Sequence, residues 1–460
     1  MGCFYLKEWR ERARLIKDLL GILGILLLLV EIYRLVRRNW LRRLLEKKKK
    51  EKRPRKPPVL RPKSERDCRF CREEKGKRTD AKQEMPISWQ LRKGRGGRKK
   101  EIPTEGYFCP NKSCEYYGIT EEEIHALVGY GVHGAKEVIQ DFKCQACKKK
   151  FTARKNTILY RLKSHSALIE KILWLLALGV DASALEEVFG VREITIRTWL
   201  CRSGMQGKKL HERFMAELEL VHVQLDELWA NVKDSSQDMW VWIASDVKTK
   251  LIPVMQVGGR SQETAFSVVH ELKGRLADRC VPVFSTDGLK HYFYALTAHF
   301  GKWETGDGKK PVWVLLGEFV YGQVIKHQRR RRTMEVERRV LWGEEKQYQE
   351  RLKKAGLSGR INTAFVERVN LTIRQCVSKL TRRTWGPAKF TPELMEHLEW
   401  WRAYYHFVRY HESLEEALIQ PVKRKGKQQP RKHRKRTPAM LAGLTDRRWT
   451  VKELLHYPLP

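Results

Sequence analysis

Acidic residues are scarce in this sequence. Its 460 residues include 54 Asp and Glu against 93 Lys and Arg, which gives a formal net charge of +39 and a pI near 9.9. Such an imbalance indicates a polyanionic partner. Nucleic acid is expected before membrane lipid, because the cations that neutralise its phosphates release condensed counterions.

Long apolar runs and a recognisable secretory signal are also lacking. The apolar segment at residues 19–30 is uncharged for 12 residues, fewer than the roughly 20 that a bilayer requires. No small-residue cleavage site follows it. With Arg and Lys on both flanks, residues 19–36 are expected to form a buried or self-associating helix, or a helix on a membrane surface. A membrane-spanning helix is the less favoured alternative.

Internal repeats at the periods of solenoid proteins are absent, which argues against a stacked-repeat architecture. The length fits two to four domains. With 42% hydrophobic residues and 15 each of Trp, Tyr and Phe, the chain can bury a sizeable core. A wholly disordered polyelectrolyte is therefore excluded.

Six of the ten cysteines form three closely spaced pairs, and the other four are isolated. In a long basic chain without a secretory signal, paired cysteines indicate metal ligands in a reducing compartment, not disulfides. The pairs are Cys68/Cys71, Cys109/Cys114 and Cys144/Cys147, and the isolated residues are Cys3, Cys201, Cys280 and Cys376.

Two of these pairs predict a zinc ribbon at residues 107–160. Cys109 and Cys114 precede Cys144 and Cys147 by about 30 residues, and two such thiolate pairs satisfy a tetrahedral Zn²⁺ ion. Tyr107 is expected to pack beneath the cysteines, together with Phe151. Four thiolates leave no open position for water, so this zinc is expected to be structural.

The remaining pair, Cys68 and Cys71, lies in a basic segment at residues 61–106. It could bind a second zinc ion with ligands that the sequence does not identify, or it could replace one pair in the ribbon. Both alternatives stay open on the sequence.

Residues 161–212 predict a helix-turn-helix DNA-binding domain. Gly190 and Val191 would make the turn between the two helices. The residues expected to pack inward are Ala184, Leu185, Val188, Ile194, Ile196 and Trp199. This packing would leave four side chains free to approach DNA bases or phosphates, namely Arg192, Thr195, Arg197 and Arg202.

From residue 218 to residue 415 the pattern is that of a mixed α/β domain. Strand-like segments at 221–232, 239–247 and 250–259 precede a helix from Gln262, a short strand at 281–288 and a helix from Lys290. Three strands, helix, strand and helix fit an α/β layer with a mixed sheet. The segment at about 303–360 is expected to be an insertion.

Three carboxylates in this domain are candidates for chemistry. Asp226 lies within an apolar strand, where an unpaired carboxylate is costly, and Asp287 ends a short strand. Glu367 shares one polar edge of a predicted helix with Asn370 and Arg374. Two strand aspartates and a helix glutamate could hold two divalent cations about 3.5–4 Å apart for phosphodiester displacement. Taken alone, the helix edge also fits a solvated Glu–Arg pair.

Glu227 follows Asp226 directly. Because strand residues alternate between faces, its side chain is expected on the opposite face of the sheet and in a structural role.

Five sequence blocks in order resemble bacterial insertion-sequence transposases of the DDE type, especially those with an N-terminal zinc ribbon and helix-turn-helix. The blocks are LDELWANV (225–232), WVWIASDVKTKLIPVMQVGGRSQET (240–264), FSTDGLKHY (284–292), NTAFVERVNLTIRQCVSKLTRRTW (362–385) and YYHFVRYHESL (404–414), and residues 436–455 are similar to the C-terminal ending of such proteins. The first 60 residues are not part of the usual core.

The resemblance implies an RNase H-like catalytic fold with an acidic triad of Asp226, Asp287 and Glu367. Asn370 and Arg374 match the accompanying E-x-x-N-x-x-x-R motif. It also implies two Mg²⁺ or Mn²⁺ ions, double-stranded DNA as element ends and as target, an oligomer on DNA, and a place in the bacterial cytoplasm at the nucleoid. A non-catalytic DNA-binding protein derived from a transposase is the alternative.

Together these patterns predict a multidomain α/β protein. The expected segments are an apolar helix and basic linker (1–60), a basic CxxC segment (61–106), a zinc ribbon (107–160), a helix-turn-helix (161–212), an RNase H-like catalytic domain (218–415) and a basic C-terminal tail (416–460).

Overall fold

The computed structural model describes residues 85–93, 101–233, 238–305, 310–329, 332–381, 386–422 and 431–459. All of these residues belong to one unit, Pro57–Pro460. The expectations for residues 1–60, for the apolar segment 19–36 and for Cys68 and Cys71 lie outside them. Within the described ranges, no helix has the length and apolar character needed to cross a membrane.

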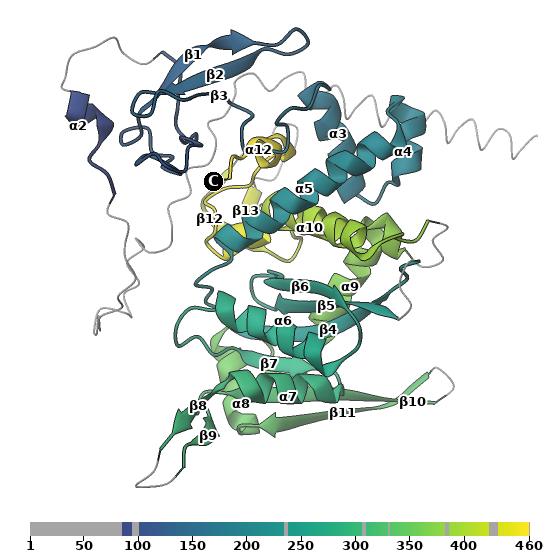
Figure 1. The fold of residues 1–460 in the computed structure, drawn as a ribbon. Coiled ribbons are helices and arrows are strands. Elements are labelled where there is room, and N and C mark those ends of the chain that lie inside the picture. Colours follow the sequence, from purple (N-terminus) through teal and green to yellow (C-terminus); the bar gives the residue numbers. More distant parts are fainter. Residues whose placement is uncertain are drawn as a thin grey trace, which may run out of the picture. The chain divides into compact units, whose positions relative to one another are not determined.

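A six-stranded mixed sheet forms the centre of an α/β structure (Figure 1). Its order is β11-β10-β7-β4-β5-β6. The β4–β7 and β7–β10 pairs are parallel, and the others are antiparallel. The strands are β4 (His222–Ala230), β5 (Met239–Asp246), β6 (Val254–Gly258), β7 (Val283–Thr286), β10 (Val320–Arg329) and β11 (Arg332–Trp342).

Helices cover both faces of this sheet. Because the side chains of β4 point alternately to the two faces, they show which helices each face contacts. Val223 and Leu225 belong to the core that includes α6 (Gln262–Arg275) and α7 (Lys290–His299). Leu228 and Ala230 belong to a second core, built with α9 (Ala364–Cys376) and α10 (Thr391–Phe407). Successive strand residues point to opposite faces, so even-numbered β4 residues face α9. The predicted order of strands and helices between residues 221 and 299 is confirmed.

A helical group precedes the sheet and packs on α10. It consists of α3 (Ser166–Ala177), α4 (Ala182–Phe189) and the long α5 (Glu193–Phe214). Asp181 caps α4, and Gly190 ends it in the left-handed conformation. Gly204 and Gly207 let α5 approach the backbone of α10 closely, because a Cβ at Gly204 would lie 2.2 Å from the Glu396 carbonyl oxygen.

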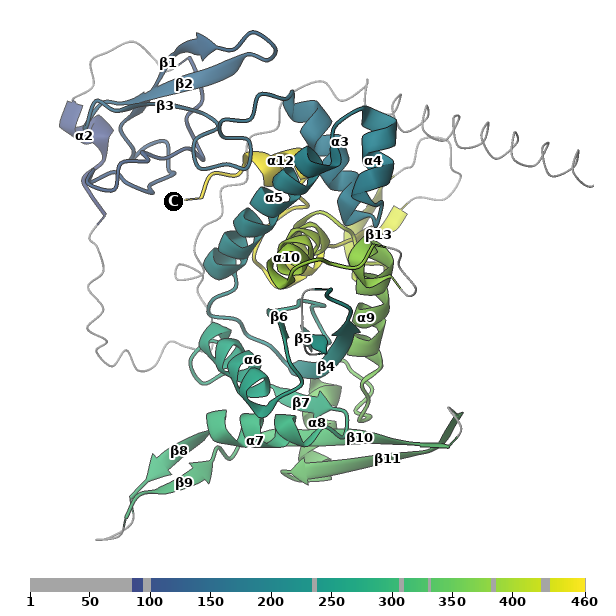
Figure 2. The ribbon, with the colours of Figure 1, turned by 45° about the vertical axis from the view of Figure 1, so that its right-hand side comes forward.

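The cysteine-bearing part forms a separate three-stranded antiparallel sheet (Figure 2). Its elements are α2 (Trp89–Lys93), β1 (Leu127–His133), β2 (Ile139–Cys144) and β3 (Lys150–Thr152). Tyr107 and Phe151 pack against the buried cysteines, which confirms the expected packing.

One expectation about segment boundaries needs correction. The expected insertion at 303–360 contains the end of β8 (Gly301–Glu304), then β9 (Val312–Leu315), β10, β11 and α8 (Glu345–Lys354). Strand β10 pairs in parallel with β7 inside the main sheet. Much of this segment is therefore part of the central sheet. The short 3₁₀ turn η3 (Ser378–Leu380) follows α9.

The described part of residues 416–460, expected as a basic C-terminal tail, contains helices and strands. It contains most of β12 (Glu415–Val422), then β13 (Arg431–Lys435), α11 (Pro438–Leu441) and α12 (Val451–His456). Trp449 is fully buried; its ring lies tilted against Phe407, with the ring centres 4.7 Å apart, and Phe214 is edge-on to it. Side chains from residues 439–459 belong to the same core as α6 and α7, and a buried aromatic ring such as that of Trp449 contributes a large apolar area to it.

Candidate functional site

The first carboxylates of the site are placed by strand register. The last paired positions of the parallel strands β4 and β7 are Leu225 and Thr286. Asp226 and Asp287 are the next residues of each chain segment, so both lie where β7 ends. The carboxyl ends of parallel strands are the usual place for ligand sites in α/β sheets.

Asp226 faces α9. Its Oδ2 accepts a hydrogen bond from Asn370 Nδ2 at 2.7 Å, and its Oδ1 accepts one from the backbone N–H of Glu227 at 2.9 Å. Burial, helped by the charges of Glu227 and Asp287, raises the pKa of Asp226 to about 7. A carboxyl with such a pKa is held in surroundings that disfavour its charge unless a cation is near.

Glu227 does face the opposite side of the sheet, as expected, and there it contacts α7 and the β6–α6 loop. It accepts hydrogen bonds from Tyr292 Oη at 3.1 Å and from Arg260 Nε at 2.9 Å. Carboxylate oxygens of Glu227, Asp226 and Asp287 nevertheless lie within 4.8 Å of one another. They converge because β7 has ended at this level, and no strand separates the two faces.

Asp287 is the third carboxylate of this cluster. Its Oδ1 accepts a hydrogen bond from the backbone N–H of Leu289 at 3.0 Å. Burial raises the pKa of Asp287 above its usual range, while that bond and the positive charges of Arg260 and Lys326 oppose the rise. Burial, followed by the charge of Asp287, also raises the pKa of Glu227.

Glu367 opens onto the same pocket from the first turn of α9. Thr363 Oγ1 donates to its Oε1 at 2.8 Å, and Lys326 Nζ forms an ion pair with the same oxygen. Glu367 is not one of the three carboxylates that converge within 4.8 Å. The pocket has a volume of about 540 Å³ and is lined by Asp226, Arg260, Asp287, Gly288, Leu289, Val324, Ile325, Lys326, Thr363 and Glu367.

Strand β4 also holds the start of α9. Gln224 is fully buried on the α9 face. Its Nε2 donates to the Asn362 carbonyl oxygen at 2.6 Å, and its Oε1 accepts from the Val366 backbone N–H at 3.0 Å. These two bonds satisfy backbone groups at a helix start that lack partners within the helix. The position of Glu367 is thereby tied to the strand that carries Asp226.

Asn370 and Arg374 differ in their relation to the pocket. Asn370 bonds Asp226, as described, and its Oδ1 is buried without a hydrogen-bond partner. Arg374 donates to the Leu380 carbonyl oxygen at 3.4 Å, near η3. The described residues that line the pocket do not include it, and its expected phosphate contact stays a prediction.

The donor set fits a divalent metal ion. Three carboxylates converge. Burial and the charge of a neighbouring carboxylate raise the pKa of each. A bound cation would relieve the repulsion between these carboxylates. The unpartnered Asn370 Oδ1 adds an oxygen beside Asp226. The cluster could therefore hold a metal ion.

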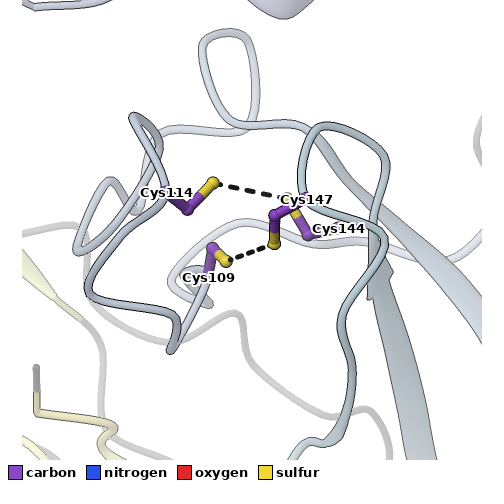
Figure 3. Close-up of side chains that lie close together, drawn as sticks. All are labelled: Cys109, Cys114, Cys144 and Cys147. Carbon is purple, nitrogen blue, oxygen red and sulfur yellow. Dashed lines mark hydrogen bonds between the residues drawn. The ribbon is translucent and has the colours of Figure 1, made fainter.

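A second cluster consists of the four predicted cysteines (Figure 3). Cys109 Sγ lies 3.5 Å from Cys147 Sγ, and Cys114 Sγ lies 3.9 Å from Cys144 Sγ. All four sulfur atoms lie within 4.8 Å of one another, so this set could also hold a metal ion. Hydrogen bonding from Cys109 lowers the pKa of Cys144 to about 5, which favours a thiolate there.

The helical group matches its prediction only in part. Leu185, Ile196 and Trp199 are buried, as expected. Ala184 is exposed, and so are Val188 and Ile194, at 61% and 66%. Their inward packing was wrong because the short α4 and the start of α5 each bury a single narrow side.

The four predicted DNA-contacting residues divide into two pairs. Arg192 is exposed at the N-cap of α5, and Thr195 lies half-buried in its first turn. Arg197 instead bonds Glu193 Oε1 through Nε at 2.8 Å and forms an ion pair with Glu393. Arg202 donates to the Tyr160 carbonyl oxygen at 2.6 Å. Arg197 and Arg202 thus make contacts within the chain.

The sequence did not indicate several residues that line the pocket or support it. Arg260, Lys326, Thr363 and Gln224 carry no motif that singles them out, since their roles follow from partners that are distant in the chain. Glu227 follows Asp226 directly, but strand alternation alone gave it a structural role.

Comparison with known proteins adds no assignment. No protein-family model matches the sequence, and no curated protein matches it. The functional argument therefore depends on the residues and their geometry.

Proposed function

We propose that this protein is a DDE-type DNA transposase. It would bind the terminal inverted repeats of its own insertion sequence, cleave one strand at each end, and join the freed 3′-hydroxyl to target DNA. The observation that carries this proposal is that Asp226, Asp287 and Glu367, two from strand ends and one from a helix, line one pocket.

The sheet supports an RNase H-like catalytic domain. Numbered along the chain, β4, β5, β6, β7 and β10 are the first to fifth strands, and their order across the sheet is 3-2-1-4-5 with the first, fourth and fifth parallel. A mixed sheet in the catalytic domain is what the sequence analysis expected. Strand β11 extends it by one antiparallel strand.

The chain's own residues can be given roles in phosphodiester cleavage. Asp226, Asp287 and Glu367 would hold Mg²⁺ or Mn²⁺, which prefer oxygen ligands and, when bound, lower the pKa of water and neutralise phosphate charge. Asn370 fixes the orientation of Asp226. Thr363 and Gln224 position Glu367 and the helix that carries it. Such chemistry depends on positioning and charge neutralisation more than on a covalent nucleophile.

The other parts fit recognition of DNA. The cysteine cluster would bind a structural Zn²⁺ in a zinc ribbon. The α4–Gly190–α5 arrangement would act as a helix-turn-helix, with Arg192 and Thr195 at the DNA. The basic character of the chain adds sequence-independent affinity. A transposase must bring two element ends together, so an oligomer on DNA is part of the proposal, as is work at the bacterial nucleoid.

The test is cleavage of the DNA that flanks this reading frame, by purified protein with Mg²⁺ or Mn²⁺. Asp226→Asn and Glu367→Gln should each abolish cleavage and leave DNA binding intact. Glu263→Gln, an exposed carboxylate in the first turn of α6, is the matched control and should cut like the parent. Cleavage by Asp226→Asn at the parental rate would refute the catalytic assignment. Binding without any cleavage by the parent would favour a non-catalytic DNA-binding protein.

A further inference from the structure

We propose that Glu227 exchanges partners: it binds a divalent cation together with Asp226 and Asp287, and in doing so it releases Arg260 to bind a DNA phosphate. The inference rests on the proposed function for the identity of the polyanion. It assigns roles to two residues outside the expected triad.

Glu227 is placed to bind a cation. Its side chain is only 2% exposed, and one of its carboxylate oxygens lies within 4.8 Å of oxygens of both aspartates. Three carboxylates this close repel one another strongly at the reduced dielectric of a protein pocket. Among the described residues, Arg260 pairs with Glu227, while Lys326, the other cation that lines the pocket, pairs with Glu367. A second, independent pointer to a ligand is the buried Asn370, whose amide bonds Asp226 while its Oδ1 has no partner.

Arg260 is placed to exchange Glu227 for another anion. Its side chain is 43% exposed although its partner is buried, and it lines the pocket beside Asp287. Its guanidinium also lies 4.8 Å from the ring centre of Trp240. This cation–π contact does not involve Glu227, so it can persist when the ion pair opens. The backbone before it is fixed by the bond from Trp242 Nε1 to the Gly259 carbonyl oxygen, at 3.2 Å.

The exchange follows from charge compensation. When a divalent cation neutralises Glu227, the attraction between Glu227 and Arg260 weakens. The guanidinium, held at the mouth of the pocket, is then available for bidentate contact with a phosphate. Cation binding and DNA binding should therefore favour each other, and by linkage the effect must be reciprocal.

The test measures binding of Mn²⁺ by electron paramagnetic resonance, and binding of a short duplex without element ends, with and without Mn²⁺. In the parent, Mn²⁺ should raise DNA affinity. Glu227→Gln should weaken Mn²⁺ binding at least several-fold and raise the metal-free DNA affinity. Arg260→Gln should lower the affinity for DNA with Mn²⁺ present and reduce the salt slope by about one. Glu263→Gln and Arg279→Gln, both exposed and outside the pocket, are the controls.

The outcomes separate the two proposals. Unchanged Mn²⁺ affinity in Glu227→Gln, with loss in Asp226→Asn, would overturn the exchange and leave the transposase proposal standing. If the parent cleaves no DNA, and Mn²⁺ no longer raises the DNA affinity of Glu227→Gln or of Asp226→Asn, the exchange is supported and the transposase proposal is refuted. Because Glu227→Gln could also disturb folding, its thermal unfolding is compared with the parent. Arg260→Gln, at a partly exposed position, then decides the matter: an unaltered salt slope and affinity would overturn the exchange.

Discussion

Asn370 donates a hydrogen bond of 2.7 Å to Asp226, and through it helix α9 meets strand β4 at the most perturbed carboxyl of the pocket. The two residues are 144 positions apart in the chain. The amide stabilises one oxygen of Asp226, but burial and two neighbouring carboxylates still raise its pKa to about 7. The site is therefore costly to the fold and suited to a cation, a combination typical of functional sites.

Asp226→Asn should stabilise the protein at neutral pH when divalent ions are chelated. The folded protein keeps the Asp226 proton up to about pH 7, whereas the unfolded chain loses it near pH 4. Folded protein binds more protons in this window, so its stability falls as the pH rises from about 4 to 7. The variant lacks this loss and should gain about 4 kcal/mol above pH 7, because the folded and unfolded pKa values differ by about three units and each unit corresponds to about 1.4 kcal/mol.

Urea unfolding in EDTA, measured from about pH 4 to about pH 8, checks this expectation. The free energies of variant and parent should agree at the acid end and diverge as the pH rises. A difference that is the same at every pH would contradict the assignment of Asp226 as the titrating group.

Gln224→Leu should impair the pocket without touching a carboxylate. The substitution introduces an apolar side chain of similar size and leaves the Asn362 carbonyl and the Val366 N–H without their bonds. Two buried backbone groups without partners should cost about 2–4 kcal/mol. Gln256→Leu removes a bond to Glu271 at a half-buried position and should cost less than about 1 kcal/mol. Urea unfolding and DNA cleavage are the measurements, and equal losses in both variants would contradict the role of Gln224.

Much of this arrangement could be predicted from the sequence, because local patterns determine it. Apolar strands between turn residues indicated β4 to β7, and Cys spacing predicted the four-sulfur cluster. The convergence of Glu227 could not be predicted, since it depends on where the neighbouring strand β7 ends. The ion pair of Arg197 with Glu393 and the burial of Trp449 depend on partners far along the chain, which periodicity does not identify.

Cys144→Ser should remove one equivalent of zinc and unfold the cysteine-bearing sheet. Structural zinc sites of this kind contribute about 10–16 kcal/mol of apparent binding free energy, and a hydroxyl is a poor substitute for the Cys144 thiolate. Metal content by atomic emission and the thermal unfolding curve are the measurements. Cys201→Ser, outside the cluster, is the control. Retention of zinc by Cys144→Ser would contradict the site.

Cys68→Ser separates the two alternatives for the remaining cysteine pair. If the four clustered sulfurs bind zinc by themselves, this variant keeps one equivalent, and a fall from two to one would identify a second site. A fall to zero would mean that Cys68 is a ligand of the ribbon itself.

Arg192→Ala and Arg197→Ala should affect different properties. Arg192 is exposed at the N-cap of α5, so its loss should weaken DNA binding and reduce the salt slope by about one, with stability unchanged. Arg197 is held by Glu193 and Glu393, so its loss should lower stability by about 1 kcal/mol. Fluorescence anisotropy at several salt concentrations and urea unfolding distinguish the two effects. Equal effects on DNA binding would mean that Arg197 leaves its ion pairs on the DNA.

Gly204→Ala should destabilise the contact between α5 and α10 by several kcal/mol. The added Cβ would lie 2.2 Å from the Glu396 carbonyl oxygen and 2.5 Å from the Glu396 Cα. These are backbone atoms, so the helices themselves must separate, which would also strain the buried bond between His211 and Glu399. In Gly274→Ala, near the end of α6, the Cβ meets nothing within 4 Å, and the gain in helix propensity should stabilise by about 0.5–1 kcal/mol. Urea unfolding of both variants measures the contrast. A loss of less than about 1 kcal/mol in Gly204→Ala would show that α5 and α10 can move apart at the small cost typical of a loosely packed contact.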